Sequence, residues 1–129
     1  MYLLDATVFA DHVDGVFGAS ELVERLFSET GDIFTCDAVV AEATSKGTDE
    51  QVQFIERLVR ALEYVSTSPS DALRAGELRR ARGQSSHRRL GDTLIAAVAA
   101  SLGATVVTRN PKDFEAYGVP VLGYGQTSG

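Results

Sequence analysis

Short apolar runs alternate with segments of helical periodicity along the whole chain. The first run, Tyr2-Leu3-Leu4, is apolar throughout, which is typical of a strand buried on both faces of a parallel sheet. Further strands are expected at residues 33–35, 64–65, 105–108 and 120–122. Because helices separate the strands, the pattern indicates an α/β fold, a three-layer sandwich with helices on both faces of a parallel sheet.

Helix-start signals lie between these strands. Thr48 begins a capping box that reaches Gln51, and Ser68 precedes a proline at the first helical position. Asp37 is expected to be an N-cap, and Asp92 is expected to open a helix that ends at Leu102. A turn is expected at residues 110–112.

The length of 129 residues suits one domain spanning residues 1–129, with residues 123–129 as a flexible tail. No apolar stretch approaches the ~20 residues that span a bilayer, and no signal peptide or membrane contact is expected. The single cysteine, Cys36, excludes an intrachain disulfide and fits a reducing compartment. We therefore expect a cytoplasmic protein.

Charge is unevenly distributed. The net charge is −6, yet residues 1–63 hold thirteen acids and four bases, whereas residues 64–129 hold five acids and eight bases. Such a local excess of bases can follow a phosphate backbone even in an acidic protein. A solvated helix face followed by a polar loop is the alternative interpretation. The candidate RNA contacts in this stretch are Arg79, Arg80, Arg82, Arg88 and Arg89.

Four acidic residues lie where apolar runs end or helices begin. In an α/β fold this is the edge of the sheet at which ligands bind. Carboxylates that meet there would repel one another unless a hard dication such as Mg²⁺ or Mn²⁺ lay among them. Each acid alone could instead cap a helix or form a turn. The four are Asp5, Glu42, Asp92 and Asp113.

Two threonines accompany these acids. Thr7 follows Asp5 by two residues, and Thr108 ends the fourth predicted strand. Their hydroxyls could orient a carboxylate or a metal-bound water, and β-propensity or local capping explains them equally well. The set as a whole predicts a metal-dependent enzyme of phosphoryl transfer.

The segments LLDATVFAD, VVAEAT and GDTLIAAVAASLGATVVTRNPKDF resemble the ordered motifs of PIN-domain ribonucleases, above all the VapC toxins of toxin–antitoxin pairs. The resemblance implies a sheet of order 3-2-1-4-5 and endonucleolytic cleavage of RNA by metal-activated water. It implies Asp5, Glu42, Asp92 and Asp113 as catalytic acids, with Asp5, Asp92 and Asp113 as ligands of Mg²⁺ or Mn²⁺. It also implies a homodimer and an antitoxin that blocks the site with its C-terminal segment.

One position departs from the family pattern. Asn110 stands where some relatives have another acid, so it is grouped with Thr7 and Thr108 as a supporting residue, and Arg109 beside it is a candidate phosphate contact. Two other hypotheses remain open. One is a non-catalytic PIN-shaped module that binds RNA or protein. The other is a haloacid-dehalogenase-like phosphatase with Asp5 as nucleophile, although Thr7 replaces the second aspartate of that motif.

Overall fold

The fold is a five-stranded parallel sheet with helices around it, as a computed structural model of residues 1–83 and 90–125 shows. The strand order is β3-β2-β1-β4-β5, and every neighbouring pair is parallel. Both the fold class and the strand order expected from the sequence are therefore confirmed. The strands are β1 (Tyr2–Leu4), β2 (Ile33–Cys36), β3 (Glu63–Val65), β4 (Thr105–Thr108) and β5 (Val121–Gly123).

The central strand β1 is the most deeply buried part of the sheet. Leu3 aligns with Phe34 on one side and with Val106 on the other. Leu3 and Leu4 are completely buried, as are Val106 and Val107 of β4. Wholly apolar strands are favoured here because helices cover the sheet on both faces.

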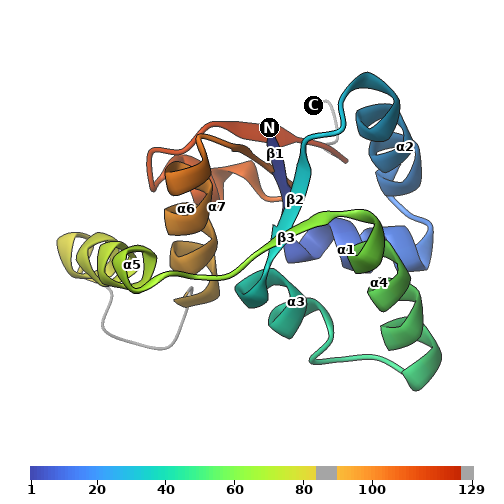
Figure 1. The fold of residues 1–129 in the computed structure, drawn as a ribbon, viewed down its shortest axis with the longest axis horizontal. Helices are drawn as coiled ribbons and strands as arrows, with labels where there is room; N and C mark the ends of the chain where they lie inside the picture. The colour runs from blue at the N-terminus through green and yellow to red at the C-terminus, as the bar shows by residue number, and fades with distance from the viewer. Residues whose placement is uncertain (84–89, 126–129) are drawn as a thin grey trace.

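Seven helices connect and cover the strands in the described part of the chain. In Figure 1, α1, α2 and α4 lie to the right of the strands, and α5, α6 and α7 lie to the left, while α3 lies below them. The helices are α1 (Ala6–Asp14), α2 (Ala19–Glu29), α3 (Asp37–Ala43), α4 (Asp49–Ala61), α5 (Pro69–Ala81), α6 (Leu90–Leu102) and α7 (Pro111–Glu115).

Local capping explains where two of these helices begin. The Thr48 side chain accepts from the Gln51 backbone N–H, and the Gln51 side chain accepts from the Thr48 N–H. Ser68 and Asp71 form the same reciprocal pair at the start of α5. Each pair satisfies backbone donors that the first helical turn leaves free, so both predicted helix starts are confirmed.

Three local predictions need correction. Cys36, rather than Asp37, is the N-cap of α3, and the Asp37 carboxylate instead accepts from the hydroxyl of Thr67 at 2.7 Å. Residues 110–112 do not form a simple turn, because Pro111 begins the short helix α7. Helix α6 begins at Leu90, so Asp92 lies in its first turn.

The C-terminal segment also differs from the expected tail. Gly123 is the last residue of β5, and Tyr124 is buried. Burial of the Tyr124 ring keeps this part of the chain on the body of the protein. Residues 126–129, the rest of the predicted tail, lie outside the described residues.

None of the helices described in residues 1–83 and 90–125 has the length and apolar character needed to cross a bilayer.

Candidate metal centre

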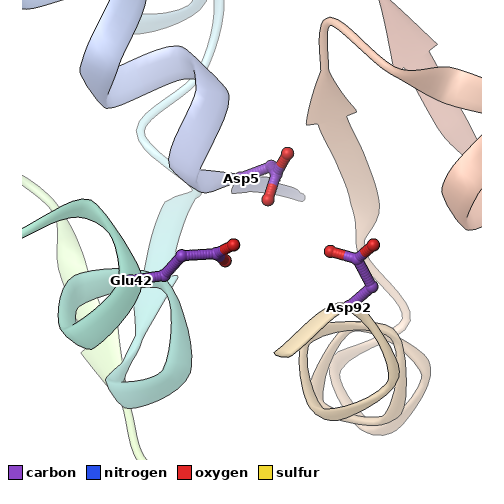
Figure 2. Close-up of side chains that lie close together, drawn as sticks. All are labelled: Asp5, Glu42 and Asp92. Carbon is purple, nitrogen blue, oxygen red and sulfur yellow. The ribbon is translucent and has the colours of Figure 1, made fainter. Parts of the chain in front are cut away.

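Three acidic side chains from separate elements converge at the carboxyl edge of the sheet. Asp5 directly follows β1, in extended conformation before α1. Glu42 lies on α3, the helix that follows β2, and Asp92 lies in the first turn of α6. Figure 2 shows the three carboxylate groups pointing into the same space between these elements. The parallel topology thus brings together residues that are up to 87 positions apart in sequence.

The three acids are close enough to share one ion. One carboxylate oxygen from each of Asp5, Glu42 and Asp92 lies within 4.8 Å of the corresponding oxygens of the other two. Asp5 is buried, Asp92 is half-buried and Glu42 is exposed. A Cβ atom placed on Gly91 would lie 3.4 Å from Glu42 Oε2, so the glycine leaves room for this carboxylate beside α6.

Hydroxyl groups hold the Asp5 carboxylate from one side. Thr108 Oγ1 donates to Asp5 Oδ2 at 2.8 Å, and Thr7 Oγ1 donates to the same oxygen at 3.1 Å. Each hydroxyl in turn accepts a backbone N–H, from Asn110 to Thr108 at 3.0 Å and from Arg109 to Thr7 at 3.1 Å. Because the amides occupy acceptor positions on the hydroxyls, the hydroxyl protons are directed toward Asp5.

This arrangement perturbs two of the acids. Burial raises the pKa of Asp5 above its ordinary value, and the hydrogen bonds from Thr108 and Thr7 oppose that rise. Although Glu42 is exposed by surface area, desolvation by the neighbouring groups raises its pKa; repulsion from Asp5 adds to this rise, and Lys46 opposes it. Clustered carboxylates with raised pKa values are typical of functional sites, since the fold maintains them at a cost in stability.

The residues present fit a hard divalent cation. Carboxylate oxygens are the ligands that Mg²⁺ and Mn²⁺ prefer, and Mg²⁺ binds them at about 2.0–2.1 Å. A positive ion among Asp5, Glu42 and Asp92 would remove their repulsion and favour the ionised state of Asp5 and Glu42.

Asp113, the fourth predicted acid, lies outside this group in the described part of the chain. It is a half-buried residue of α7, and its backbone N–H donates to the carbonyl of Asn110. Asn110 precedes α7, and its N–H supports Thr108. The sequence predicted Asp113, and not Glu42, as a metal ligand. The distances between carboxylate oxygens instead place Glu42 in the cluster with Asp5 and Asp92.

The predicted RNA-contacting arginines fall into three groups. Arg82 donates to the Ala116 carbonyl at 2.9 Å and lies over the Tyr117 ring, so it connects the end of α5 to α7. Arg79 is half-buried and Arg80 is exposed, both in the last turn of α5. Arg88 and Arg89 lie outside the described residues. Of the described members of this set, Arg80 and Arg82 are exposed.

Arg109 is also engaged with other protein groups. Its Nε lies 3.2 Å from Asp11 Oδ2, and its guanidinium carbon lies 4.3 Å from the centre of the Phe17 ring. These contacts hold the side chain against other protein groups, and its contact with phosphate stays a prediction. No sequence signal pointed to Asp11, because its partners are about 100 residues distant in the chain.

A groove of about 590 Å³ runs alongside the acidic cluster and was not expected from the sequence. Glu42 and Thr7 lie at its border with the cluster, and Lys46 lines it from the segment after α3. Its apolar lining comes from α1, α3 and α4. The lining includes Ala6, Ala10, Val13, Ala43 and Ile55. Such a concave apolar surface beside convergent polar groups is typical of a binding site.

The raised pKa of Asp5 predicts how stability depends on pH in the metal-free protein. The unfolded chain loses this proton near the ordinary value of 3.8, whereas the folded protein retains it to higher pH. The contribution of Asp5 to stability is therefore fully present below pH 3.8 and is lost as pH rises through the raised folded pKa. Thermal melts in chelator are expected to show wild type losing stability relative to Asp5→Asn over this window. A constant difference between the two proteins across the window would contradict the predicted shift.

Comparisons with known proteins agree with this geometry. The PIN-domain family model matches residues 2–120. The chain is 29% identical over 116 residues to Ribonuclease VapC19 of Mycobacterium tuberculosis, covering 88% of this chain and 92% of the relative.

Two solved structures share the fold. VapBC2 of Rickettsia felis, bound to a DNA fragment from its promoter, matches with a TM-score of 0.77 at 22% identity, over 95% of this chain and 98% of that one. A toxin–antitoxin complex from Klebsiella pneumoniae matches with a TM-score of 0.74 at 22% identity, over 95% and 96% of the two chains.

Proposed function

The chain belongs to the PIN-domain family, and from that premise we propose that it is a metal-dependent endoribonuclease, the toxin of a type II toxin–antitoxin pair. The observation that carries the proposal is the convergence of Asp5, Glu42 and Asp92 within 4.8 Å at the carboxyl edge of the sheet. The ribonuclease name of the Mycobacterium tuberculosis relative supports the same activity.

Within this proposal, Asp5, Glu42 and Asp92 hold Mg²⁺ or Mn²⁺. When bound, such an ion activates water at neutral pH and stabilises charge on a phosphodiester during hydrolysis. Thr7 and Thr108 both donate to Asp5 Oδ2, which fixes the orientation of this carboxylate beside Glu42 and Asp92. Asp113 remains in the proposal as a further acid of the site, with Asn110 as a supporting residue.

The RNA substrate would approach from the exposed side of the cluster, where Glu42 meets solvent. An acidic site repels a phosphate backbone unless cations bind it, so basic groups nearby would help to retain RNA. Arg80 and its neighbour Arg79, in the last turn of α5, are the described candidates. Arg88 and Arg89 are further candidates on sequence grounds.

The partner in this proposal is a VapB-like antitoxin protein, and the toxin is expected to be a homodimer. The toxin–antitoxin complex from Klebsiella pneumoniae supports this assembly through its shared fold. The groove beside Glu42 offers an apolar lining for a segment of such a partner, which would then cover the acids. A cytoplasmic location, expected from the sequence, belongs to the same proposal.

Incubation with total RNA tests the activity. We expect discrete cuts when Mg²⁺ or Mn²⁺ is present and no cuts when a chelator removes it, because without the ion nothing lowers the pKa of the attacking water or offsets the charge on the phosphodiester. Sequencing of the new RNA ends maps the cleavage sites. Cleavage that persists in chelator would contradict the metal requirement. Metal binding without any cleavage would favour the non-catalytic binding module.

A further inference from the structure

A buried ionic cluster lies on the side of α1 that faces the C-terminal segment. Asp11 of α1 is 4% exposed, and its Oδ2 accepts from the hydroxyl of Tyr124 at 2.7 Å. The same oxygen lies 3.2 Å from Arg109 Nε. Burial and the hydrogen bond to Asp11 raise the pKa of the Tyr124 phenol, which therefore stays protonated and donating. Three distant segments of the chain meet at this one carboxylate.

The Arg109 side chain, which is 34% exposed, makes a second contact. The Phe17 ring packs on the guanidinium at 4.3 Å, a contact between a cation and an aromatic face. Phe17 adopts a left-handed backbone with φ of 56°, and a Cβ atom on Gly125 would lie 2.8 Å from Phe17 Cβ. The chain after β5 therefore passes directly against Phe17, and this close approach requires glycine at position 125.

The backbone of Arg109 connects this cluster to the acidic centre. Its N–H donates to Thr7 Oγ1 at 3.1 Å, and Thr7 Oγ1 donates to Asp5 Oδ2 at 3.1 Å. Arg109 therefore takes part in both clusters. Its side chain contacts Asp11 and Phe17, and its backbone amide supports Thr7. A shift of this residue would move the Thr7 hydroxyl relative to Asp5.

We propose that Arg109 is a positioning residue for the metal centre, held by Asp11, Phe17 and Tyr124 so that its amide orients Thr7 toward Asp5. The inference rests on the proposed function, because it assumes that Asp5 binds a cation. It replaces the phosphate contact expected for Arg109. Turning the guanidinium out to RNA would leave the buried Asp11 carboxylate without its cation, which is strongly unfavourable.

Titration of Mn²⁺ by calorimetry, in the absence of RNA, tests this role. Arg109→Met is expected to weaken Mn²⁺ binding by about tenfold, the lower end of the effect of residues that orient metal ligands. Thr7→Val removes the hydroxyl through which Arg109 acts. If that is the only route, the double variant binds Mn²⁺ no more weakly than Thr7→Val alone, a non-additive result. Arg74→Met, at an exposed position of α5, is the matched control and leaves Mn²⁺ affinity unchanged.

Two outcomes would overturn the proposal. An unchanged Mn²⁺ affinity in Arg109→Met, with the slope of RNA affinity against salt reduced by about one, would assign Arg109 to a phosphate. Strictly additive losses in the double variant would show that Arg109 does not act through Thr7. If Arg109→Met fails to fold, Tyr124→Phe and Arg109→Lys carry the test, with weaker Mn²⁺ binding expected in both and unchanged binding contradicting the proposal.

The Mn²⁺ titrations test the positioning role of Arg109, whereas the RNA cleavage assay tests the proposed ribonuclease activity. A wild-type protein that binds Mn²⁺ but cuts no RNA would refute the ribonuclease, and the positioning role would still be decided by the Mn²⁺ titrations. A wild-type protein that does not bind Mn²⁺ would overturn the positioning role as well, since no metal centre would exist for Arg109 to support.

Discussion

Asp92→Asn is expected to slow RNA cleavage by on the order of 10²–10³-fold, the usual effect of removing one group that stabilises charge in a transition state. The substitution keeps the shape of the side chain and removes one negative charge from the group of three. The neutral amide is a poor ligand for a hard dication, so the remaining acids would hold the ion weakly. The fold should persist, because Asp92 is half-buried in the first turn of α6 and the change is nearly isosteric.

Asp49→Asn is the matched control for this variant. Asp49 also lies in the first turn of a helix, α4, and is exposed. Both substitutions remove a favourable interaction with a helix N-terminus, but only Asp92→Asn removes a charge from the acidic cluster. Initial rates of cleavage on one RNA substrate distinguish the two variants, because Asp49→Asn is expected to cleave at the wild-type rate. Equal cleavage by wild type and Asp92→Asn would remove this acid from the mechanism.

Saturating Mn²⁺ is expected to raise the melting temperature of the wild-type protein by roughly 10 °C. An ion at one hundred times its dissociation constant stabilises the folded state by about 2.7 kcal/mol, and a chain of this length converts that to a shift of this size. The physical reason is that the ion binds the assembled Asp5, Glu42 and Asp92, which are brought together only by folding. Melts followed by circular dichroism, with and without Mn²⁺, measure the shift.

Asp5→Asn should abolish this response. The same variant should melt at a higher temperature than wild type in chelator at neutral pH, because it removes a buried carboxylate whose pKa is raised by burial. Asp14→Asn, an exposed acid at the end of α1, is the control and should respond to Mn²⁺ as wild type does. A full Mn²⁺ shift in Asp5→Asn would show that the ion binds elsewhere.

The arrangement of the sheet follows closely from local patterns. Wholly apolar strands, such as Tyr2–Leu4, are typical of a sheet covered on both faces, and the helical segments between them favour a parallel sheet. Asp5 is predictable for the same reason, since a charged residue directly after a buried strand must lie at the edge of the sheet. The capping residues Thr48 and Ser68 act within one helical turn and need no tertiary information.

Other features of the site depend on contacts between distant segments. The inclusion of Glu42 in the cluster depends on how α3 lies against α6, which sequence periodicity does not encode. From the sequence alone, the side chain of Arg109 could contact either RNA or another part of the protein. Only the fold shows that it lies beside Asp11, which also accepts from Tyr124. A turn was expected before Asp113 because proline disrupts the interior of a helix, but proline is favourable at the first position of α7.

Crystals soaked in Mn²⁺ and measured at the manganese absorption edge show directly whether the three acids bind one dication, since anomalous scattering locates the ion without reference to activity. We expect one anomalous peak bounded by carboxylate oxygens of Asp5, Glu42 and Asp92, and no such peak in crystals of Asp92→Asn. A peak at another place on the protein, or none among these three residues at saturating Mn²⁺, would contradict this expectation.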